Sequence, residues 1–517
     1  MTPSTPQLGG VVKRNAESLA GQRALVVGLG RFGGGVGVTR WLAENHAAVT
    51  VTDQATHDAL AESVAAIADL PVTLHLGGHD ERDLDTADLV VINPAVHKAT
   101  SAFFQTIVRR GIPWTTEMNL FCERCPSRVI GVTGSYGKST TCAMLAEVLE
   151  AARRAGGVTY TGVHLGGNIG RSLLNDLPDI RESDWVVLEM SNAQLEDLPR
   201  IDWAPDIAVI TNLFPHHLDR YSSFADYAHA KLNITRHPEG TSKIVVGELH
   251  PDAEDLLLTA VAGRRERLVR IPVLSPEGTP ADLPVELKVP GRHNQRNAAC
   301  VLTVCRLLGL NEAVVRAALC DFKGLPHRLE FIRTLDGVDY YNDSKSTAPA
   351  ATVIAVEALR RPTVAIVGGQ RKNVCLTDCA KVLAQCCRVV ICMGESGPAF
   401  AEAVNAARRA VSSEPPQEQG PGAPGCGGFA SELLSPTGGE DRVRGFQDAP
   451  LPNSNPVRTM VHTVNGVPDA VRIARTEAKP GEVVLFSPGA PSFDQYVNFT
   501  ARGHDFAELI NGLRPLP

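Results

Sequence analysis

This sequence of 517 residues has no apolar run long enough to cross a membrane, and it has no tract dense in lysine and arginine. The first absence argues against membrane insertion, since a spanning helix needs about 20 consecutive apolar residues. The second absence, together with a net charge of -7, argues against nucleic acid as the main partner. The first twenty residues also lack the apolar segment of a secretory signal, so we expect a cytoplasmic protein.

The twelve cysteines lack a recognised metal-binding arrangement. Cys122 and Cys125 form one C-x-x-C pair without a matching second pair, and the other cysteines do not fall on a zinc spacing. Reduced and mostly buried thiols are the usual state of cysteine in a large cytosolic chain. We therefore expect no structural metal on cysteine.

The length is too great for one hydrophobic core and suggests about three domains, at roughly 150 residues each. Charged residues make up 21% of the chain and hydrophobic residues 44%. These fractions are typical of a globular protein.

The most informative stretch is the segment from Gly131 to Ser139, which fits the pattern G-x-x-x-x-G-K-[ST]. An apolar run at 129–132 predicts a strand before it, and a helical pattern at 140–152 follows it. This strand, loop and helix are the context that a phosphate-binding loop requires. Lys138 would add a positive charge and Ser139 a hydroxyl for Mg²⁺, which indicates ATP as the ligand.

A second glycine-rich turn comes earlier in the chain. A predicted strand at 23–28 leads into Gly28, Gly30 and Gly33, and the next strand, at 49–52, ends on Asp53. This pattern is typical of a Rossmann-like half that holds a diphosphate, but it does not distinguish nicotinamide from another nucleotide. A third apolar strand, at 89–92, ends in Asn93-Pro94.

Glu189 ends a predicted strand at 185–188, about fifty residues beyond the phosphate loop. A carboxylate at this edge of a parallel sheet lies where a Mg²⁺ ligand is needed. The alternative is a strand-end glutamate in solvent. With the loop upstream, the metal is the better interpretation.

Several further polar residues have more than one interpretation. The paired His216 and His217 follow a strand at 207–211 and could bind metal, relay protons or pack. Lys231 lies in a helical pattern, where a lysine is normally solvated. Asn294 and Asn297 are one helical turn apart and could face one ligand or serve as caps.

The last third of the chain predicts another parallel sheet. Strands at 364–367, 389–393 and 483–486 end in glycine, lysine, serine and aspartate residues. Between the last two strands, residues 412–456 are more than one-third proline and glycine, which is typical of a disordered or loosely ordered insertion. We assign this insertion no catalytic role.

The ordered motifs resemble the Mur ligase family of peptidoglycan precursor synthesis. The resemblance rests on the segments 131–140, 212–221, 324–330 and 342–347 and on the C-terminal segment 487–499. It implies an α/β protein of three domains: a Rossmann-like UDP-substrate domain (1–122), a central P-loop ATPase-like domain (123–324) and a Rossmann-like amino-acid-binding domain (325–517).

The activity implied by the resemblance is that of an ATP-dependent amide ligase. The short first domain and the segment 487–499 are most similar to the member that adds D-glutamate to UDP-N-acetylmuramoyl-L-alanine through an acyl phosphate. A monomer that uses ATP and two Mg²⁺ ions is expected. The diaminopimelate- or lysine-adding member carries an Asp-Asn-Pro-Arg signature that is absent here.

The resemblance also assigns roles to residues of this chain. The expected catalytic and metal-binding residues are Lys138, Ser139, Glu189, His217 and a carbamylated Lys231. The expected ATP-binding residues are Gly134, Ser135, Gly137, Lys138, Ser139, Thr140, Asn294, Asn297, Arg328 and Asp343. The UDP-substrate residues are Gly28, Gly30, Gly33, Asp53, Asn168 and His217, and the D-glutamate residues are Lys345, Thr347, Lys372, Ser492 and Phe499.

The chain departs from the family pattern at His216, Ala193, Asn93-Pro-Ala and Gln370-Arg371. A diverged ligase with another amino acid substrate is therefore one alternative. A nicotinamide oxidoreductase and a nucleotide-gated binding protein are two others, which differ in whether NADH binds and whether phosphate is released.

Overall fold

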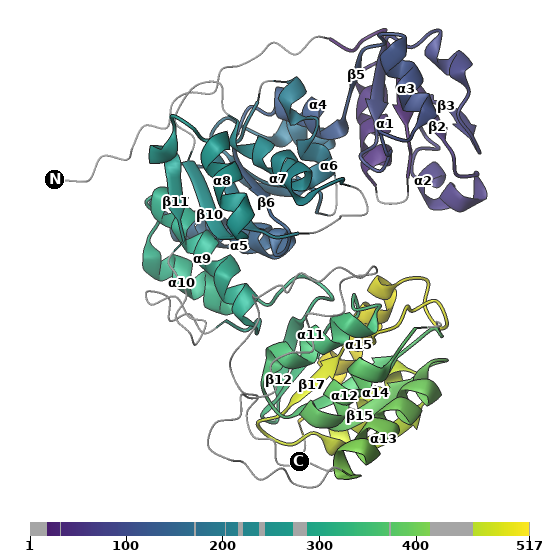
Figure 1. Ribbon diagram of the computed structural model, residues 1–517, viewed down its shortest axis with the longest axis vertical. Coiled ribbons are helices and arrows are strands. Elements are labelled where there is room, and N and C mark those ends of the chain that lie inside the picture. Colours follow the sequence, from purple (N-terminus) through teal and green to yellow (C-terminus); the bar gives the residue numbers. More distant parts are fainter. Residues whose placement is uncertain are drawn as a thin grey trace, which may run out of the picture. The chain divides into compact units, whose positions relative to one another are not determined.

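The computed structural model describes residues 18–30, 33–169, 172–201, 203–215, 221–236, 243–271, 287–371, 374–413 and 459–515 (Figure 1). They form three sheets in two compact units. The first unit contains the first two sheets and residues 295–320, and the second contains the third sheet and residues 287–294.

The first sheet has five parallel strands in the order β3-β2-β1-β4-β5. Its strands are β1 (Arg23–Val27), β2 (Ala48–Asp53), β3 (Thr73–Leu76), β4 (Leu89–Ile92) and β5 (Trp114–Thr115). The accompanying helices are α1 (Gly34–Glu44), α2 (Ala61–Ala65), α3 (Ala102–Arg109) and α4 (Glu117–Arg124), with 3₁₀ turns at Asp58–Leu60 and Glu81–Leu84. Side-chain caps from Ser101 and Thr116 begin α3 and α4.

The second sheet has six parallel strands in the order β11-β10-β9-β6-β8-β7. Its strands are β6 (Arg128–Thr133), β7 (Val163–Gly167), β8 (Trp185–Glu189), β9 (Ile207–Leu213), β10 (Lys243–Leu249) and β11 (Leu268–Arg270). Its helices are α5 (Lys138–Ala155), α6 (Asn192–Leu195), α7 (Phe224–Leu232), α8 (Pro251–Ala260), α9 (Arg292–Leu307) and α10 (Glu312–Asp321). Short 3₁₀ turns lie at Leu174–Asp179, Leu198–Arg200, Asn233–Thr235 and Arg265–Arg267.

The third sheet has the order β12-β13-β17-β14-β15-β16. Its strands are β12 (Glu330–Leu335), β13 (Val338–Asn342), β14 (Thr363–Gly368), β15 (Cys387–Met393), β16 (Met460–Val464) and β17 (Val483–Phe486). Its helices are α11 (Pro349–Leu359), α12 (Thr377–Cys386), α13 (Gly397–Ser413), α14 (Val467–Glu477) and α15 (Phe499–Gly512).

One edge of the third sheet is antiparallel, which our parallel interpretation missed. Strands β12 and β13 pair antiparallel across a two-residue turn, Asp336-Gly337, in which both residues have positive φ. Such a turn matches the twist of a hairpin, and Asp-Gly is its common sequence. The other strand pairs of this sheet are parallel.

The predicted fold class, an α/β protein with three mainly parallel sheets, is confirmed. Strands β6, β8 and β14 are almost entirely buried, as expected for parallel strands that are covered on both faces. One hydrophobic core runs through the first and second sheets, and it includes Trp41 and Phe121 from the first and Leu174 and Leu188 from the second. The third sheet has a separate core on each face.

Strand β7 ends on two glycines, Gly166 and Gly167. A Cβ on Gly166 would lie 2.3 Å from Cγ of Leu173, and one on Gly167 would lie 2.3 Å from the carbonyl oxygen of Glu189. These glycines therefore permit close packing within a strand.

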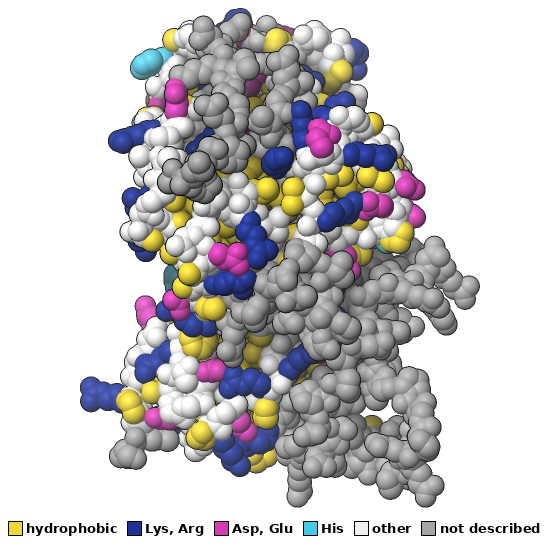
Figure 2. Space-filling model, turned by 90° about the vertical axis from the view of Figure 1, so that its left-hand side faces the viewer, with side chains coloured by type: hydrophobic (Ala, Val, Ile, Leu, Met, Phe, Trp, Pro, Cys, Tyr) yellow, Lys and Arg dark blue, Asp and Glu magenta, His cyan; other side chains and the backbone are white. Residues whose placement is uncertain are grey.

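The distribution of charge on the surface and the apolar character of the helices both agree with the composition. Basic and acidic side chains are interspersed over the face in Figure 2, without a continuous basic area among the coloured atoms. Among the residues that the structure describes, no helix combines the length and apolar character needed to span a bilayer.

Candidate active site

Two glycines shape the loop that joins β6 to α5. Gly137 has a φ of 78°, and a Cβ there would lie 2.3 Å from Oδ1 of Asn297. Gly134 has a φ of 150°, and its Cβ would lie 2.0 Å from Oγ1 of Thr211. Only glycine fits at either position, because it tolerates positive φ and lacks the clashing atom.

The end of β9 holds this loop from the other side. Asn212 accepts a hydrogen bond from the Tyr136 amide at 2.9 Å and donates one to the Tyr136 carbonyl at 2.9 Å. Thr211 donates to the same carbonyl at 2.6 Å, and Ser135 Oγ donates to the Phe214 carbonyl at 2.8 Å. These hydrogen bonds within the chain hold the loop in one conformation, and electrostatic binding of phosphate relies on donors that are fixed in this way.

The start of α5 carries the charge and hydroxyls of the loop. Lys138 Nζ donates to the carbonyls of Gly134 at 3.0 Å and Ser135 at 3.2 Å. Ser139 and Thr140 lie half-buried in the first turn of α5, whose N-terminal amides favour an anion. Backbone amides, one cation and hydroxyls thus converge as a phosphate site requires.

Glu189 lies beside the loop because Val132 of β6 pairs with Glu189 of β8. Its side chain is buried, and Oε1 accepts a hydrogen bond from Asn168 Nδ2 at 2.8 Å. The other oxygen, Oε2, is buried and has no hydrogen-bond partner among the described residues. A buried carboxylate oxygen without a donor suits a divalent cation, so the residues present fit Mg²⁺.

Lys231 is buried in α7, although its sequence position suggested a solvated side chain. Its Nζ lies 3.4 Å from Oγ1 of Thr133, at the end of β6, and 5.0 Å from the ring centre of Tyr227. Burial lowers the pKa of Lys231 well below its usual value, Lys138 lowers it further, and Glu189 opposes the shift. Burial therefore disfavours the charged form of the amine at this position.

The two candidate asparagines of α9 have different surroundings. Asn297 lies against Gly137, and its carboxamide therefore borders the phosphate loop. Asn294 donates from Nδ2 to the Pro290 carbonyl at 2.8 Å, which is a contact of the turn before the helix. Both the ligand-facing and the turn interpretation thus have structural support, one at each residue.

In the first domain, Asp53 lies on the glycine-rich turn. The Gly30 amide donates to Asp53 Oδ2 at 3.0 Å, and Gly28, with a φ of 95°, packs against Asn93. Asn93 Nδ2 also donates to the Gly28 carbonyl at 3.1 Å. Gly33 precedes α1 in the left-handed region, so the turn leads directly into a helix N-terminus.

The third domain contains a buried carboxylate, Asp343, at the end of β13. Its oxygens accept hydrogen bonds from the Leu329 amide at 3.1 Å, Ser346 Oγ at 2.5 Å and Ser487 Oγ at 2.8 Å. Burial raises the pKa of Asp343 to about 6, although these hydrogen bonds and the charge of Arg328 oppose the shift. Arg328 itself is exposed.

Of the residues expected to bind the amino acid, only Lys345 and Phe499 are linked by a contact among the described residues. Lys345 Nζ lies 5.9 Å from the ring centre of Phe499, and both side chains reach the surface. Thr347 is exposed, and Ser492 is buried in a neighbouring loop.

Arg502 joins the two loops that carry Lys345 and Ser492, and the sequence interpretation missed it. This buried guanidinium donates to the Ala490 carbonyl at 3.0 Å, the Pro491 carbonyl at 3.1 Å and the Ser344 carbonyl at 2.9 Å. Burial lowers its pKa to about 10. A cation on the otherwise apolar face of α15 was the available signal.

His216, His217 and Lys372 lie outside the described residues, so their predicted roles stay predictions. The same holds for most of the insertion at 412–456.

Three family models match successive parts of the chain. Residues 22–115 match the Mur ligase MurD-like N-terminal domain, 132–305 match the Mur ligase middle domain and 327–421 match the Mur ligase glutamate ligase domain.

Similar proteins extend over nearly the whole chain. A UDP-N-acetylmuramoylalanine--D-glutamate ligase from Symbiobacterium thermophilum is 32% identical, and the alignment covers 95% of this chain and 98% of that protein. The enzyme of the same name from a Roseiflexus species is also 32% identical, over 95% of this chain and 99% of that protein. The solved structure of UDP-N-acetylmuramate-alanine ligase MurC from Thermotoga maritima is 19% identical with a TM-score of 0.51, covering 95% of this chain and 99% of that one, and supports the fold.

Proposed function

This chain belongs to the Mur ligase family of ATP-dependent acid–amino-acid ligases, and we propose that it joins D-glutamate to UDP-N-acetylmuramoyl-L-alanine. The names of the full-length relatives support this substrate pair. The motifs at 212–221 and 487–499 support it from the sequence. In this proposal the protein acts as a cytoplasmic monomer in peptidoglycan precursor synthesis.

The structural observation that carries the proposal is the buried Oε2 of Glu189 beside the phosphate loop. It has no donor among the described residues, and the register of β6 and β8 holds it next to the loop. A carboxylate there, with Ser139 at the start of α5, suits a metal that accompanies ATP. A simple nucleotide-sugar-binding protein would have no need of this arrangement.

ATP in this proposal binds with its phosphates on the loop. The loop amides and Lys138 hold the phosphates, so that Lys138 exchanges its present carbonyl partners for phosphate oxygens. The residues assigned to ATP are Gly134, Ser135, Gly137, Lys138, Ser139, Thr140, Asn294, Asn297, Arg328 and Asp343.

Mg²⁺ would be held by Ser139 and Glu189, and a second ion by His217 and Lys231 after carbamylation. When bound, the metal neutralises the negative charge that develops on the transferred phosphoryl group. Carbamylation joins the neutral Lys231 amine to CO₂ with loss of one proton, which yields an anion. The burial of Lys231 among Thr133 and Tyr227 supports this assignment.

The reaction proceeds in two steps. The carboxylate of the alanyl group attacks the γ-phosphorus of ATP, which forms an acyl phosphate and releases ADP. The amine of D-glutamate then attacks the acyl carbon, loses a proton and expels phosphate through a tetrahedral intermediate. The acyl phosphate must be shielded from water during this sequence.

The two other substrates are assigned to the outer domains. UDP-N-acetylmuramoyl-L-alanine would contact Gly28, Gly30, Gly33, Asp53, Asn168 and His217. D-Glutamate would contact Lys345, Thr347, Lys372, Ser492 and Phe499. The domains of this proposal are 1–122, 123–324 and 325–517.

The test is phosphate release from ATP by the purified protein with UDP-N-acetylmuramoyl-L-alanine and bicarbonate. D-Glutamate, L-glutamate, L-lysine and meso-diaminopimelate are compared as acceptors, and we expect release with D-glutamate alone. Lys138→Met should reduce phosphate release by on the order of 10²-fold or more, because it removes the positive charge that stabilises the transition state. Arg153→Met, an exposed substitution on the same helix, is the control and should leave release unchanged.

The other outcomes distinguish the alternatives. Release with a different amino acid would identify a diverged ligase and contradict the D-glutamate assignment. Binding of ATP without release in any pairing would indicate a nucleotide-gated binding protein. Binding of NADH would favour the oxidoreductase.

A further inference from the structure

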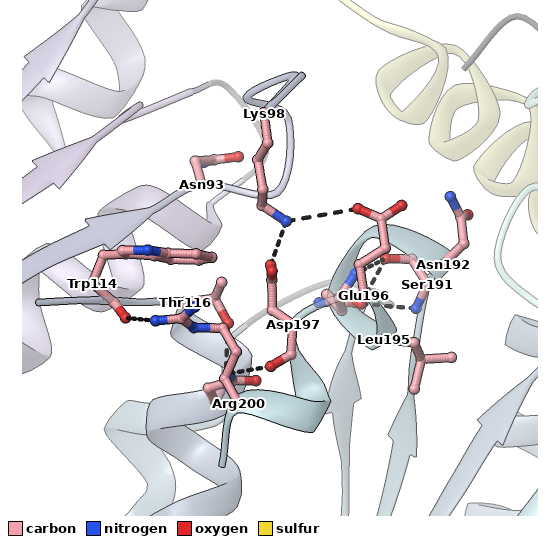
Figure 3. A network of polar contacts seen from close by, with 12 residues as sticks. Asn93, Lys98, Trp114, Thr116, Ser191, Asn192, Leu195, Glu196, Asp197 and Arg200 are labelled. Carbon is pink, nitrogen blue, oxygen red and sulfur yellow. Dashed lines mark hydrogen bonds and ion pairs between the residues drawn. The ribbon is translucent and has the colours of Figure 1, made fainter. Parts of the chain in front are cut away.

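A buried ion pair joins the first and second sheets of the first unit (Figure 3). Lys98 follows β4 in the first domain, and its Nζ lies 2.5 Å from Asp197 Oδ2 and 3.7 Å from Glu196 Oε2. Both carboxylates directly follow α6 of the central domain. The side chains of Lys98 and Asp197 are only 16% and 6% exposed, so water screens their attraction little.

The segment after α6, which carries Glu196 and Asp197, is held at two more points. The buried Asn119 of α4 donates from Nδ2 to the Asp197 carbonyl at 2.9 Å. The guanidinium of Arg200 lies 3.6 Å from the ring centre of Trp114, and its Nη2 donates to the Trp114 carbonyl at 3.3 Å. Figure 3 shows Lys98, Trp114 and Arg200 near Asp197. The segment after α6 is therefore fixed in orientation as well as in place.

On its other side, the Lys98 loop reaches the glycine-rich turn of the first domain. The loop begins at Asn93, which donates to the Gly28 carbonyl at 3.1 Å. Its end is held by Gln105 of α3, which donates to the Lys98 carbonyl at 2.8 Å. A short loop thus connects the proposed diphosphate site to the ion pair.

A similarly short segment connects the ion pair to Glu189. Between Glu189 and Asp197 the chain forms α6, which begins with a capping box between Ser191 and Gln194. Gln194 Oε1 accepts hydrogen bonds from the Ser191 amide and the Ser191 hydroxyl, both at 2.9 Å. Reciprocal caps of this kind make the start of a helix rigid.

The domain contact also has an apolar part, in which Trp41 and Leu174 share one core. Apolar contacts have no direction and tolerate small shifts, whereas a charged hydrogen bond sets distance and angle. A buried pair is a poor source of net stability, since both charges lose their hydration. The ion pair is better explained as a contact that fixes the position of the first sheet relative to the second.

We propose that Lys98 is a positioning residue whose ion pair with Asp197 and Glu196 sets the distance between the glycine-rich turn and the phosphate loop. A nucleotide substrate held by its diphosphate at the first site then presents its carboxylate at the second. This inference rests on the proposed function. An error of about 1 Å in such an alignment can reduce a rate by on the order of 10²-fold.

The test is Lys98→Met, which removes the charge and keeps the length of the side chain. We expect kcat to fall and the KM for UDP-N-acetylmuramoyl-L-alanine to rise, giving a loss of about tenfold or more in kcat/KM. The Kd for UDP should stay unchanged, because the proposed function assigns the UDP part of the substrate to Gly28, Gly30, Gly33 and Asp53 of the first domain. Lys98→Arg should restore part of the loss, and Asp197→Asn should add nothing to Lys98→Met.

Arg40→Met is the matched control. Arg40 pairs with Asp69 at 2.7 Å, its side chain is 29% exposed and both partners lie in the first domain. This variant loses an ion pair without disturbing the contact between domains, and its kinetics should equal those of the unchanged protein.

Hydrogen exchange gives a readout that does not depend on activity. Amides at 114–120 and 192–200 should exchange faster in Lys98→Met and unchanged in Arg40→Met. Unaltered kinetics and exchange in a folded Lys98→Met would overturn the inference. If this variant does not fold, the same criteria apply to Lys98→Gln, which also removes the charge. If the unchanged protein releases no phosphate with any of the amino acids tested, the proposed function has failed. Faster exchange in Lys98→Met would then still support the role of Lys98 in holding the first sheet against the second.

Discussion

At the scale of single residues, the polar groups that matter most are buried. Glu189 has one oxygen without a donor among the described residues, Lys231 lies in an apolar helix face, and Arg502 donates to three carbonyls. Burying a charge is costly unless it is compensated. In the proposed function a metal ion would compensate Glu189 and carbamylation would change the charge of Lys231. Arg502 is compensated by carbonyl groups of the chain.

Asp343 leads to a prediction about pH. Its folded pKa is about 6, above the usual value of 3.8, so between these values the folded chain holds a proton that the unfolded chain has lost. The free energy of unfolding should therefore fall as the pH rises from 4 to 6, by at most about 3 kcal/mol. Asp343→Asn should remove this dependence, so that the variant gains stability relative to the unchanged protein at higher pH.

Thermal unfolding of the full chain at several pH values between 4 and 7 measures the effect. Asp378→Asn, on α12 of the same domain with a side chain 43% exposed, is the control and should follow the unchanged protein. A stability difference for Asp343→Asn that is constant with pH would show that the carboxyl titrates normally.

At the scale of elements, function depends on short turns at the ends of parallel strands. The turns after β1, β6 and β9 all contain residues that another part of the chain holds in position. The carboxyl ends of such strands are the usual ligand-binding edge of an α/β sheet. Helices enter the site through their N-termini, as α5 does beside the phosphate loop.

Gly137→Ala tests the phosphate loop. The new Cβ would meet Asn297, and the residue would also have to adopt a φ of 78°. We expect phosphate release to fall by about tenfold or more, since strain and displacement both act on the site. The measurement is the steady-state rate at saturating ATP together with the thermal midpoint.

Gly156→Ala is the control for this substitution. Gly156 ends the same helix with a φ of 81° and has nothing within 4 Å of its Cβ position. It should cost about 1 kcal/mol of stability and leave the rate unchanged. If both variants lost the same activity, the loss in Gly137→Ala would come from backbone strain in general and not from a change in the phosphate loop.

At the scale of the whole molecule, the chain combines a first unit that carries the phosphate loop with a second unit that carries Asp343 and Lys345. The first unit already joins two sheets through one core and a buried ion pair. Relatives that are 32% identical align over 95% of this chain, so the alignments extend across all three sheets.

Excision of residues 414–458 tests whether this segment contributes to the proposed reaction. Arg408, five residues before the end of α13, donates to the Thr459 carbonyl at 2.9 Å, so the last part of α13 lies beside the start of β16. A linker of about five residues, the usual length between a helix and a strand, should therefore join them. We expect the phosphate-release rate and the thermal midpoint to stay the same. A folded but inactive variant would contradict our assignment of no catalytic role.

Much of the fold could be predicted from the sequence because its signals are local. The strands at 129–132, 185–188 and 207–211 and the helix after the phosphate loop were confirmed, since apolar runs and glycine spacing identify them directly. The hairpin of β12 and β13 was missed although its Asp-Gly turn was present. Strand β7 extends through Gly166 and Gly167, where glycine permits close packing rather than a turn.

The sequence alone determined the order of the three sheets and the nature of the phosphate loop, because each depends on residues close together in the chain. The tertiary structure decided which distant groups meet. Lys98 and Asp197 are 99 residues apart, and Arg502 lies 158 residues beyond its partner Ser344. No local pattern encodes such pairs, since they exist only after the sheets have packed and water has been removed from between them.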